Sequence, residues 1–299
     1  MSKSDRAPAT PSAPKRGATP SASKRGAAPG APKRGAPSAP KRTPSAPKLR
    51  VAPGAPKRGA APEEIAAALE KELRAAGTLG RAVQEKRYLK SALEHFGVPV
   101  PEVRRRTLAA LRAVKDLTRE EVIALARRLW SRPVHELRSA AAEVLKARAK
   151  LLVAEDATDV LEPLLRESKT WALVDTLSAE IGHVMLERFP KELAGTLDRW
   201  AKDDDFWVRR SALLALLGGL RRGGGDFERF SRYADAMLEE KEFFIRKAIG
   251  WILRETSKKR PELVAEWVAP RAARMSGLTL REATRQLPPK LQAAARREA

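Results

Sequence analysis

The residues of this sequence best suited to catalysis are an aromatic residue and an acidic residue four positions apart. Trp171 and Asp175 lie in the segment 168–176. On a helix, that spacing places an indole and a carboxylate on one face, one turn apart. A single carboxylate among cations and aromatic rings suits a reaction that develops positive charge. The alternative, from this segment alone, is a tryptophan in the core and an aspartate on a solvated face.

The elements that would position these residues are helices. From Pro62 onward the apolar residues recur with a period of about 3.6, and no convincing alternating strand is present, so we expect an all-α body. The first helix should begin at Pro62 and stop at Gly77, the second should end near Gly97, the third should start at Pro101, and a capping-box pattern begins a fourth at Thr118. Further helices are expected near residues 132–152, 158–167, 170–189, 191–202, 206–220, 227–240, 242–259 and 261–275.

These helices also repeat. Four dipeptides recur at steps of 37, 34 and 37 residues: Leu137-Arg138, Val174-Asp175, Val208-Arg209 and Ile245-Arg246. Small or apolar residues follow four positions after each first member, which is typical of a HEAT-like solenoid of paired helices whose inner helices line a concave surface. Asp175 stands where the other three units have arginine, and this difference favours a functional role for its carboxylate.

Residues 1–61 have a different composition. They contain 12 of the 22 prolines, 6 of the 18 glycines and no aromatic residue, and Lys-Arg pairs recur every eight or nine residues from Lys15-Arg16 to Lys57-Arg58 in all but one interval. We expect a disordered basic tail, because this composition offers too little apolar surface to offset the entropy of ordering. The tail carries 14 basic residues and one acidic residue, Asp5. It resembles histone H1-like bacterial tails, with a solubilising linker as the alternative.

The formal net charge of the chain is +22, with 59 Lys and Arg against 37 Asp and Glu. Such a charge predicts an anionic polymer as partner, either nucleic acid or an acidic membrane surface. No apolar run is long enough to span a bilayer, and no secretory signal is evident. The chain has no cysteine and three scattered histidines without metal-ligand spacing, so we expect a cytoplasmic protein with no metal and no cofactor.

Over roughly residues 80–275 the sequence resembles a known family, the AlkD-like DNA alkylation repair family. The likeness is carried by four groups of residues: Lys169-Thr170-Trp171 with Asp175, Gly182-His183-Val184, Trp207 with Arg209-Arg210, and the block from Lys241 to Glu255. One departure is the loop at residues 223–225, which lengthens the segment between Arg210 and Trp251. The resemblance implies a curved HEAT-like body, residues 62–299, that binds duplex DNA and removes N3- or N7-alkylated purines without flipping the base.

The resemblance also implies roles for individual residues. Trp171 and Trp251 match two tryptophans beside the deoxyribose of the lesion, and Asp175 matches the catalytic carboxylate. Arg210 matches an arginine that helps to hold the site and the backbone, and Tyr88 falls near an aromatic residue of the cleft. Candidate DNA contacts, each with a solvated helix face as the alternative, are Lys169, Arg209, Arg246, Lys247, Arg254, Lys258 and Lys259.

The chemistry agrees with this assignment. Alkylation at N7 or N3 makes the purine a cationic leaving group, and bond breaking leaves an oxocarbenium-like sugar that a nearby carboxylate can stabilise. We therefore expect a monomeric, nucleoid-associated bacterial DNA glycosylase. The alternatives are a non-catalytic protein that binds DNA structures on the same scaffold, and a protein-binding solenoid.

Overall fold

The computed structural model describes residues 61–114 and 116–296. The regular secondary structure of these residues is helical, apart from one isolated β-bridge between Glu94 and Val134. The prediction of an all-α helical repeat is therefore confirmed. None of the described helices is both long and apolar enough to cross a membrane. The predicted basic tail lies outside the described residues, except for Ala61.

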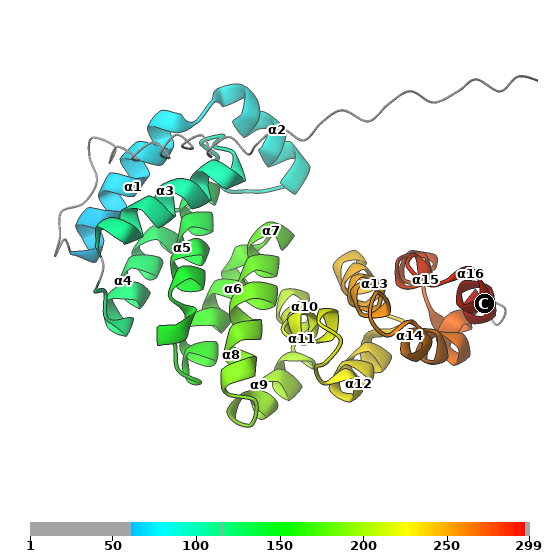
Figure 1. Ribbon diagram of the computed structural model, residues 1–299. Coiled ribbons are helices and arrows are strands. Elements are labelled where there is room, and N and C mark those ends of the chain that lie inside the picture. Colours follow the sequence, from blue (N-terminus) through cyan, green and yellow to red (C-terminus); the bar gives the residue numbers. More distant parts are fainter. Residues whose placement is uncertain (1–60, 115, 297–299) are drawn as a thin grey trace, which may run out of the picture. The chain divides into compact units, whose positions relative to one another are not determined.

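The chain is a succession of short helices, coloured from blue to red in Figure 1. The first half contains α1 (Pro62–Ala76), α2 (Leu79–Leu89), α3 (Val100–Ala113), α4 (Arg119–Trp130), α5 (His135–Ala147) and the 3-10 helix η1 (Ala149–Leu151). The middle contains the π-helical η2 (Ala157–Leu161), α6 (Glu162–Ser168), α7 (Trp171–Asp175), the π-helical η3 (Thr176–Gly182), α8 (His183–Arg188), α9 (Glu192–Trp200), α10 (Phe206–Leu214) and α11 (Leu217–Arg221). The last part contains α12 (Phe227–Met237), α13 (Phe243–Ser257), α14 (Pro261–Val268), the 3-10 helix η4 (Ala269–Arg274), α15 (Gly277–Thr284) and α16 (Pro289–Arg296).

The beginnings of two helices show how the sequence specifies them. Proline and two glutamates fill the first turn of α1, where a missing N–H costs nothing and negative charge is favourable. At α4 the side chain of Thr118 accepts from the backbone N–H of Glu121, whose carboxylate accepts from the N–H of Thr118. The capping box expected there is thus confirmed.

The repeat register expected from the sequence is the packing register of the helices. The helices α5, α7, α10, α13 and α15 pack against one another in chain order (Figure 1). The first residue of each recurring dipeptide is completely buried between them: Leu137, Val174, Val208 and Ile245. The second residue of each, including Asp175, is partly exposed. The repeat therefore turns its apolar position into the core and the neighbouring position towards the helix surface.

Side-chain hydrogen bonds tie each repeat to the next. Many join residues 35 to 38 positions apart, close to the length of one repeat. Examples are Arg119 to Asp156, Trp130 to Glu167, Arg166 to Asp203, Trp200 to Glu162, Arg210 to Asp175 and Arg271 to Asp235. These bonds link equivalent positions of successive units, so they hold the helices in register in addition to the apolar core.

Some predicted boundaries were wrong. The second helix ends at Leu89 rather than near Gly97, because Lys90 adopts the left-handed conformation and the following segment pairs with residues 133–135. The helix predicted over 206–220 is interrupted between α10 and α11. The helices α15 and α16 lie beyond the last predicted one.

Candidate active site

The short helix α7 carries both Trp171 and Asp175. Trp171 is its first residue and Asp175 is its last, so the two side chains lie one turn apart on one face. The π-helical η3 follows at once and runs through Gly182. Such π-helical turns inside helices often occur at functional sites, because the widened backbone shifts the side chains around it.

Asp175 forms a bidentate ion pair with Arg210 of α10. Nε of Arg210 donates to Oδ1 of Asp175 at 2.9 Å, and Nη2 donates to Oδ2 at 3.0 Å. The remaining nitrogen, Nη1, donates to the backbone carbonyl of Phe244 in α13. The Arg210 side chain is only 3% exposed, whereas that of Asp175 is 19% exposed. The arginine is therefore a fixed, buried group that presents a partly accessible carboxylate.

The environment of Asp175 acts on its charge in two directions. Burial raises the pKa of this carboxyl above its ordinary value, and the Arg210 guanidinium opposes part of that rise through its charge and its hydrogen bonds. A carboxylate has about four lone-pair sites, and Arg210 occupies two of them. Asp175 can consequently still accept a hydrogen bond or face a cation.

Trp171 lies on the wall of a groove with a volume of about 520 Å³. The groove is lined by Tyr88, Leu89, Lys90, Lys169, Thr170, Trp171, Trp207, Phe243 and Phe244. Tyr88 meets Trp171 edge to face at a centroid distance of 6.1 Å, and Trp207 lies 4.7 Å from Phe244. Tyr88 and Phe243 are largely exposed. The groove therefore presents aromatic rings that are in part accessible from outside the protein.

Two lysines of the groove have unusual backbones. Lys90 and Lys169 are the only non-glycine residues with positive φ in the part of the chain that the structure describes, at 50° and 49°. Both lysines are the C-cap residues of helices, α2 and α6, where the left-handed conformation is common although it is less favourable for lysine than for glycine. Neither side chain forms an ion pair with another described residue. Lys169 was among the predicted DNA contacts and Lys90 was not, because the second helix was expected to continue to Gly97 and nothing in the sequence marked Lys90 as the residue after its end.

The arginines that replace Asp175 in the other units bind backbone carbonyls. Arg138 donates to the carbonyl of Glu167, and Arg246 donates to that of Glu240. Arg209 donates to the carbonyls of Asp203 and Asp204 and forms a bidentate pair with the Glu240 side chain. Arg209 and Arg246 are thus held within the protein, and their predicted DNA contacts remain predictions.

Three other predicted DNA contacts are also engaged within the protein. Lys247 and Arg254 both pair with Glu282 of α15, and Lys258 pairs with Glu255. A phosphate would have to compete with these carboxylates. Trp251, on the same helix, is partly buried against the core and is not among the residues that line the aromatic groove. The structure brings Trp171, Asp175 and Arg210 together, and the predicted role of Trp251 remains a prediction.

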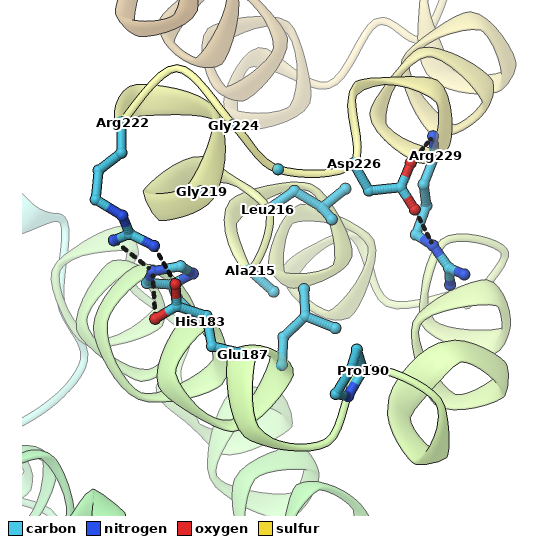
Figure 2. Close-up of a pocket in the computed structure, with 12 residues that line it drawn as sticks. His183, Glu187, Pro190, Ala215, Leu216, Gly219, Arg222, Gly224, Asp226 and Arg229 are labelled. Atoms are coloured by element: carbon cyan, nitrogen blue, oxygen red, sulfur yellow. Dashed lines mark hydrogen bonds and ion pairs between the residues drawn. The ribbon is translucent and has the colours of Figure 1, made fainter.

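A second cavity, of about 470 Å³, lies between α8 and the loop formed by residues 223–225 (Figure 2). His183 and Glu187 project from α8 towards Arg222, whose Nη1 lies 3.0 Å from Nε2 of His183. A Cβ atom at Gly218 would lie 2.2 Å from the His183 ring, so α11 needs glycine there. Gly223 and Gly225 have positive φ. His183, part of the recognised motif, thus has a structural explanation.

The fold and the site together define an all-α repeat protein with a buried carboxylate–arginine pair beside an aromatic groove. The sequence model of the family described as "DNA alkylation repair enzyme" matches residues 69–287. That match spans most of the chain, and the chain therefore belongs to this family. The family supports an enzymatic role in DNA alkylation repair, and DNA is the partner that such a role implies.

One solved structure agrees with this assignment at the level of the fold, and a second is similar over a like share of the chain. A structure titled "Predicted DNA alkylation repair enzyme from Enterococcus faecalis" is 22% identical in sequence and has a TM-score of 0.64, over 71% of this chain and 97% of its own. A crystal structure of AlkD2 from Streptococcus mutans is 18% identical and has a TM-score of 0.48, over 70% of this chain and 99% of its own. No curated protein sequence matches the chain.

Proposed function

We propose that the protein is a DNA glycosylase that hydrolyses the N-glycosidic bond of cationic N3- or N7-alkylated purines in duplex DNA without flipping the base. The observation that carries this proposal is the carboxylate of Asp175. It is fixed by Arg210 and stands one helical turn from Trp171, which lines the groove, while Asp175 itself is not among the lining residues. The family membership supports the repair role, and this geometry supports the reaction.

The reaction needs little from the protein beyond electrostatics. A purine alkylated at N7 or N3 leaves as a neutral base, so no strong general acid is required. The sugar develops positive charge as the bond breaks, and a carboxylate close to it stabilises that charge and orients the attacking water. The indole of Trp171 can face the polarised sugar, with an interaction of roughly 0.5–2 kcal/mol. Because Arg210 already holds Asp175 in place, little reorganisation is needed during the reaction.

The groove also has the cations to hold the backbone of the duplex. Lys90 and Lys169 flank its aromatic wall, and contacts from such lysines to phosphate fix the position of the duplex without reading its sequence. The exposed ring of Tyr88 stands beside Trp171. The lesion would therefore meet aromatic surface and a carboxylate while it remains in the helix.

The test is the release of 7-methylguanine from methylated duplex DNA under single-turnover conditions. We expect the wild-type protein to release the base and Asp175→Asn to lose about 10²–10³ in rate, the usual cost of removing one electrostatic contact to a transition state. Asp204→Asn is the matched control. Asp204 is an exposed aspartate close to α10, and its backbone carbonyl, not its side chain, accepts a hydrogen bond from Arg209. Duplex affinity should survive in both variants.

One observation favours the non-catalytic alternative. Arg119 holds Asp156 in the same bidentate way, and that carboxylate is only 1% exposed. A pair of this kind can therefore serve only to join two repeats. If the wild-type protein bound damaged duplex but released no base above the uncatalysed rate, this alternative would hold for Asp175 as well. Equal release by the wild type and Asp175→Asn would assign the reaction to another group.

A further inference from the structure

Three potential metal ligands meet beside α2, and none of them lines the aromatic groove. They are Glu85 of α2, His95 of the segment between α2 and α3, and Glu136 in the first turn of α5. One ligand atom from each lies within 4.8 Å of the other two. The residues are up to 51 positions apart in the chain, so local spacing of the histidines gives no sign of this cluster.

The cluster contains buried polar atoms without partners. The His95 side chain is 1% exposed, and neither of its ring nitrogens has a hydrogen-bond partner among the described residues. Oε2 of Glu85 is also buried and without a partner, and it lies 4.0 Å from Nδ1 of His95. Buried polar groups are nearly always paired, because an unpaired one retains the cost of its lost hydration. A cation between these atoms would remove that cost.

The surroundings hold the other two groups in fixed positions. The Glu136 carboxylate accepts the backbone N–H groups of Phe96, Gly97 and Val98, which fill three of its roughly four lone-pair sites and leave one. The His135 ring stacks on that of His95 at a centroid distance of 4.7 Å and an interplanar angle of 12°. Such outer contacts are what orients the ligands of a metal site.

We propose that Glu85, His95 and Glu136 form a binding site for a divalent transition-metal cation of the Zn²⁺ class. One imidazole nitrogen and two carboxylate oxygens suit Zn²⁺ and leave a fourth position for water, whereas Mg²⁺ prefers oxygen ligands alone. Ligand atoms around Zn²⁺ lie about 3.3 Å apart when the bonds are about 2.0–2.1 Å. The ligand atoms, which lie within 4.8 Å of one another, therefore need to close by up to about 1.5 Å, and rotation of the long Glu85 side chain supplies part of that movement.

The role of the site follows from the helix that it anchors. The helix α2 buries only Ala82 and Leu89, while Leu79 and Val83 are largely exposed. A helix with so few core contacts depends on other links to the body, and a metal bridge from Glu85 to α5 supplies one. The same helix carries Tyr88 to the aromatic groove. The site would thus link α2 to α5, and its existence does not depend on the proposed reaction.

The test is a calorimetric titration of the full-length protein, dialysed against chelator and free of any histidine tag, with Zn²⁺ and separately with Mg²⁺. We expect one Zn²⁺ to bind, with no comparable binding of Mg²⁺. Glu85→Gln and His95→Gln should each weaken Zn²⁺ binding by at least about 10–100-fold, the loss already seen for outer contacts. Zn²⁺ should raise the Tm of the wild type but not of these variants.

Two matched controls locate the site. Glu94→Gln removes a neighbouring, exposed carboxylate, and His183→Gln removes a histidine that pairs with Glu187 on α8. Both should bind Zn²⁺ as the wild type does. Absence of Zn²⁺ binding by the wild type, unchanged binding by Glu85→Gln and His95→Gln, or loss of binding in His183→Gln would each overturn the proposal.

X-ray absorption on the Zn²⁺-loaded wild type keeps the proposal testable if the cluster variants do not fold. The expected shell contains one imidazole, with oxygen atoms as the other ligands, at about 2.0–2.2 Å. A shell with no imidazole, or with two, would contradict the assignment.

Discussion

Asp175 differs from its three equivalents in its contacts as well as in its charge. Arg138, Arg209 and Arg246 donate to backbone carbonyls, which a carboxylate cannot do. Asp175 instead accepts hydrogen bonds from Arg210, the residue that follows Arg209 in the chain. The substitution therefore removes a structural contact from this repeat and creates a buried ion pair beside the groove, which is the strongest argument at the residue scale for a specialised role.

The pH dependence of base release follows from the surroundings of Asp175. Burial raises the pKa of its carboxyl, and the reaction needs the ionised form. The wild-type rate should therefore fall as the pH drops through a pKa above that of an ordinary aspartate. Asp175→Asn should lose this acid limb entirely. The measurement is the single-turnover release rate against pH, corrected for uncatalysed release. An acid limb that persists in Asp175→Asn would belong to another group.

The two lysines with left-handed backbones give a test of the DNA contacts. Asparagine adopts this conformation more readily than lysine and removes the charge, so Lys90→Asn and Lys169→Asn should leave the fold intact. Each should weaken duplex binding and reduce the slope of log K against log salt by about 0.9, the value for one phosphate contact. Lys202→Asn, at an exposed lysine after α9, is the control and should change neither quantity. The same loss in all three variants would show only a general effect of charge.

At the scale of the helices, much of the fold could be predicted because the apolar period and the caps are local signals. The start of α1 at Pro62 and the capping box of α4 were both expected from a few neighbouring residues. The end of α2 was not, since it depends on the pairing of Glu94 with Val134, which lie 40 positions apart. Long-range pairing of this kind leaves no pattern in the local sequence.

The residues of the candidate site could be proposed from the sequence, but their contacts could not. The spacing of Trp171 and Asp175 indicated a shared helix face, and the family likeness supplied Arg210. The bidentate geometry and the groove around Lys90 depend on how α2, α7, α10 and α13 pack. The same holds for the internal pairing of Arg209, because its partner Glu240 comes from the next repeat.

The packing of α8 against α11 can be tested with two glycines. Gly218→Ala would place a Cβ within 2.2 Å of the His183 ring, and we expect a loss of about 1–3 kcal/mol in the free energy of unfolding. Gly195→Ala, inside α9, meets nothing within 4 Å and should stabilise the protein by about 0.5–1 kcal/mol. Urea denaturation measures both. An unchanged or higher stability of Gly218→Ala would show that His183 moves aside without cost.

The charge of the whole molecule is unevenly distributed along the chain. Residues 1–61 carry 14 basic residues and one acidic residue, whereas the other 238 residues carry 45 basic and 36 acidic ones. Many basic residues of the helical body form ion pairs with acidic residues of the same body, such as Arg166 with Asp203 and Arg271 with Asp235. Most of the net charge of +22 therefore lies outside the helical body. We propose that this distribution separates two tasks, attraction to DNA in general and chemistry at a lesion.

Deletion of residues 1–61 tests that separation. The 14 basic side chains have no aromatic neighbours in the tail to stack on bases, so they can contact phosphates without reading sequence. Each contact contributes about −0.9 to the slope of log K against log salt. The truncated protein should therefore bind undamaged duplex more weakly and with a flatter salt dependence. The difference should shrink as ionic strength rises, because surface charges are screened within about 8–10 Å near physiological salt.

Chemistry should respond differently from affinity in the same truncated protein. Single-turnover release of 7-methylguanine at saturating enzyme should hardly change, because Asp175, Arg210 and Trp171 all belong to the retained helices. Unchanged affinity and slope at low salt would mean that the tail serves a linker function or another partner. A collapse of the single-turnover rate would place the tail in the active site, and the division of the chain at Pro62 would then be wrong.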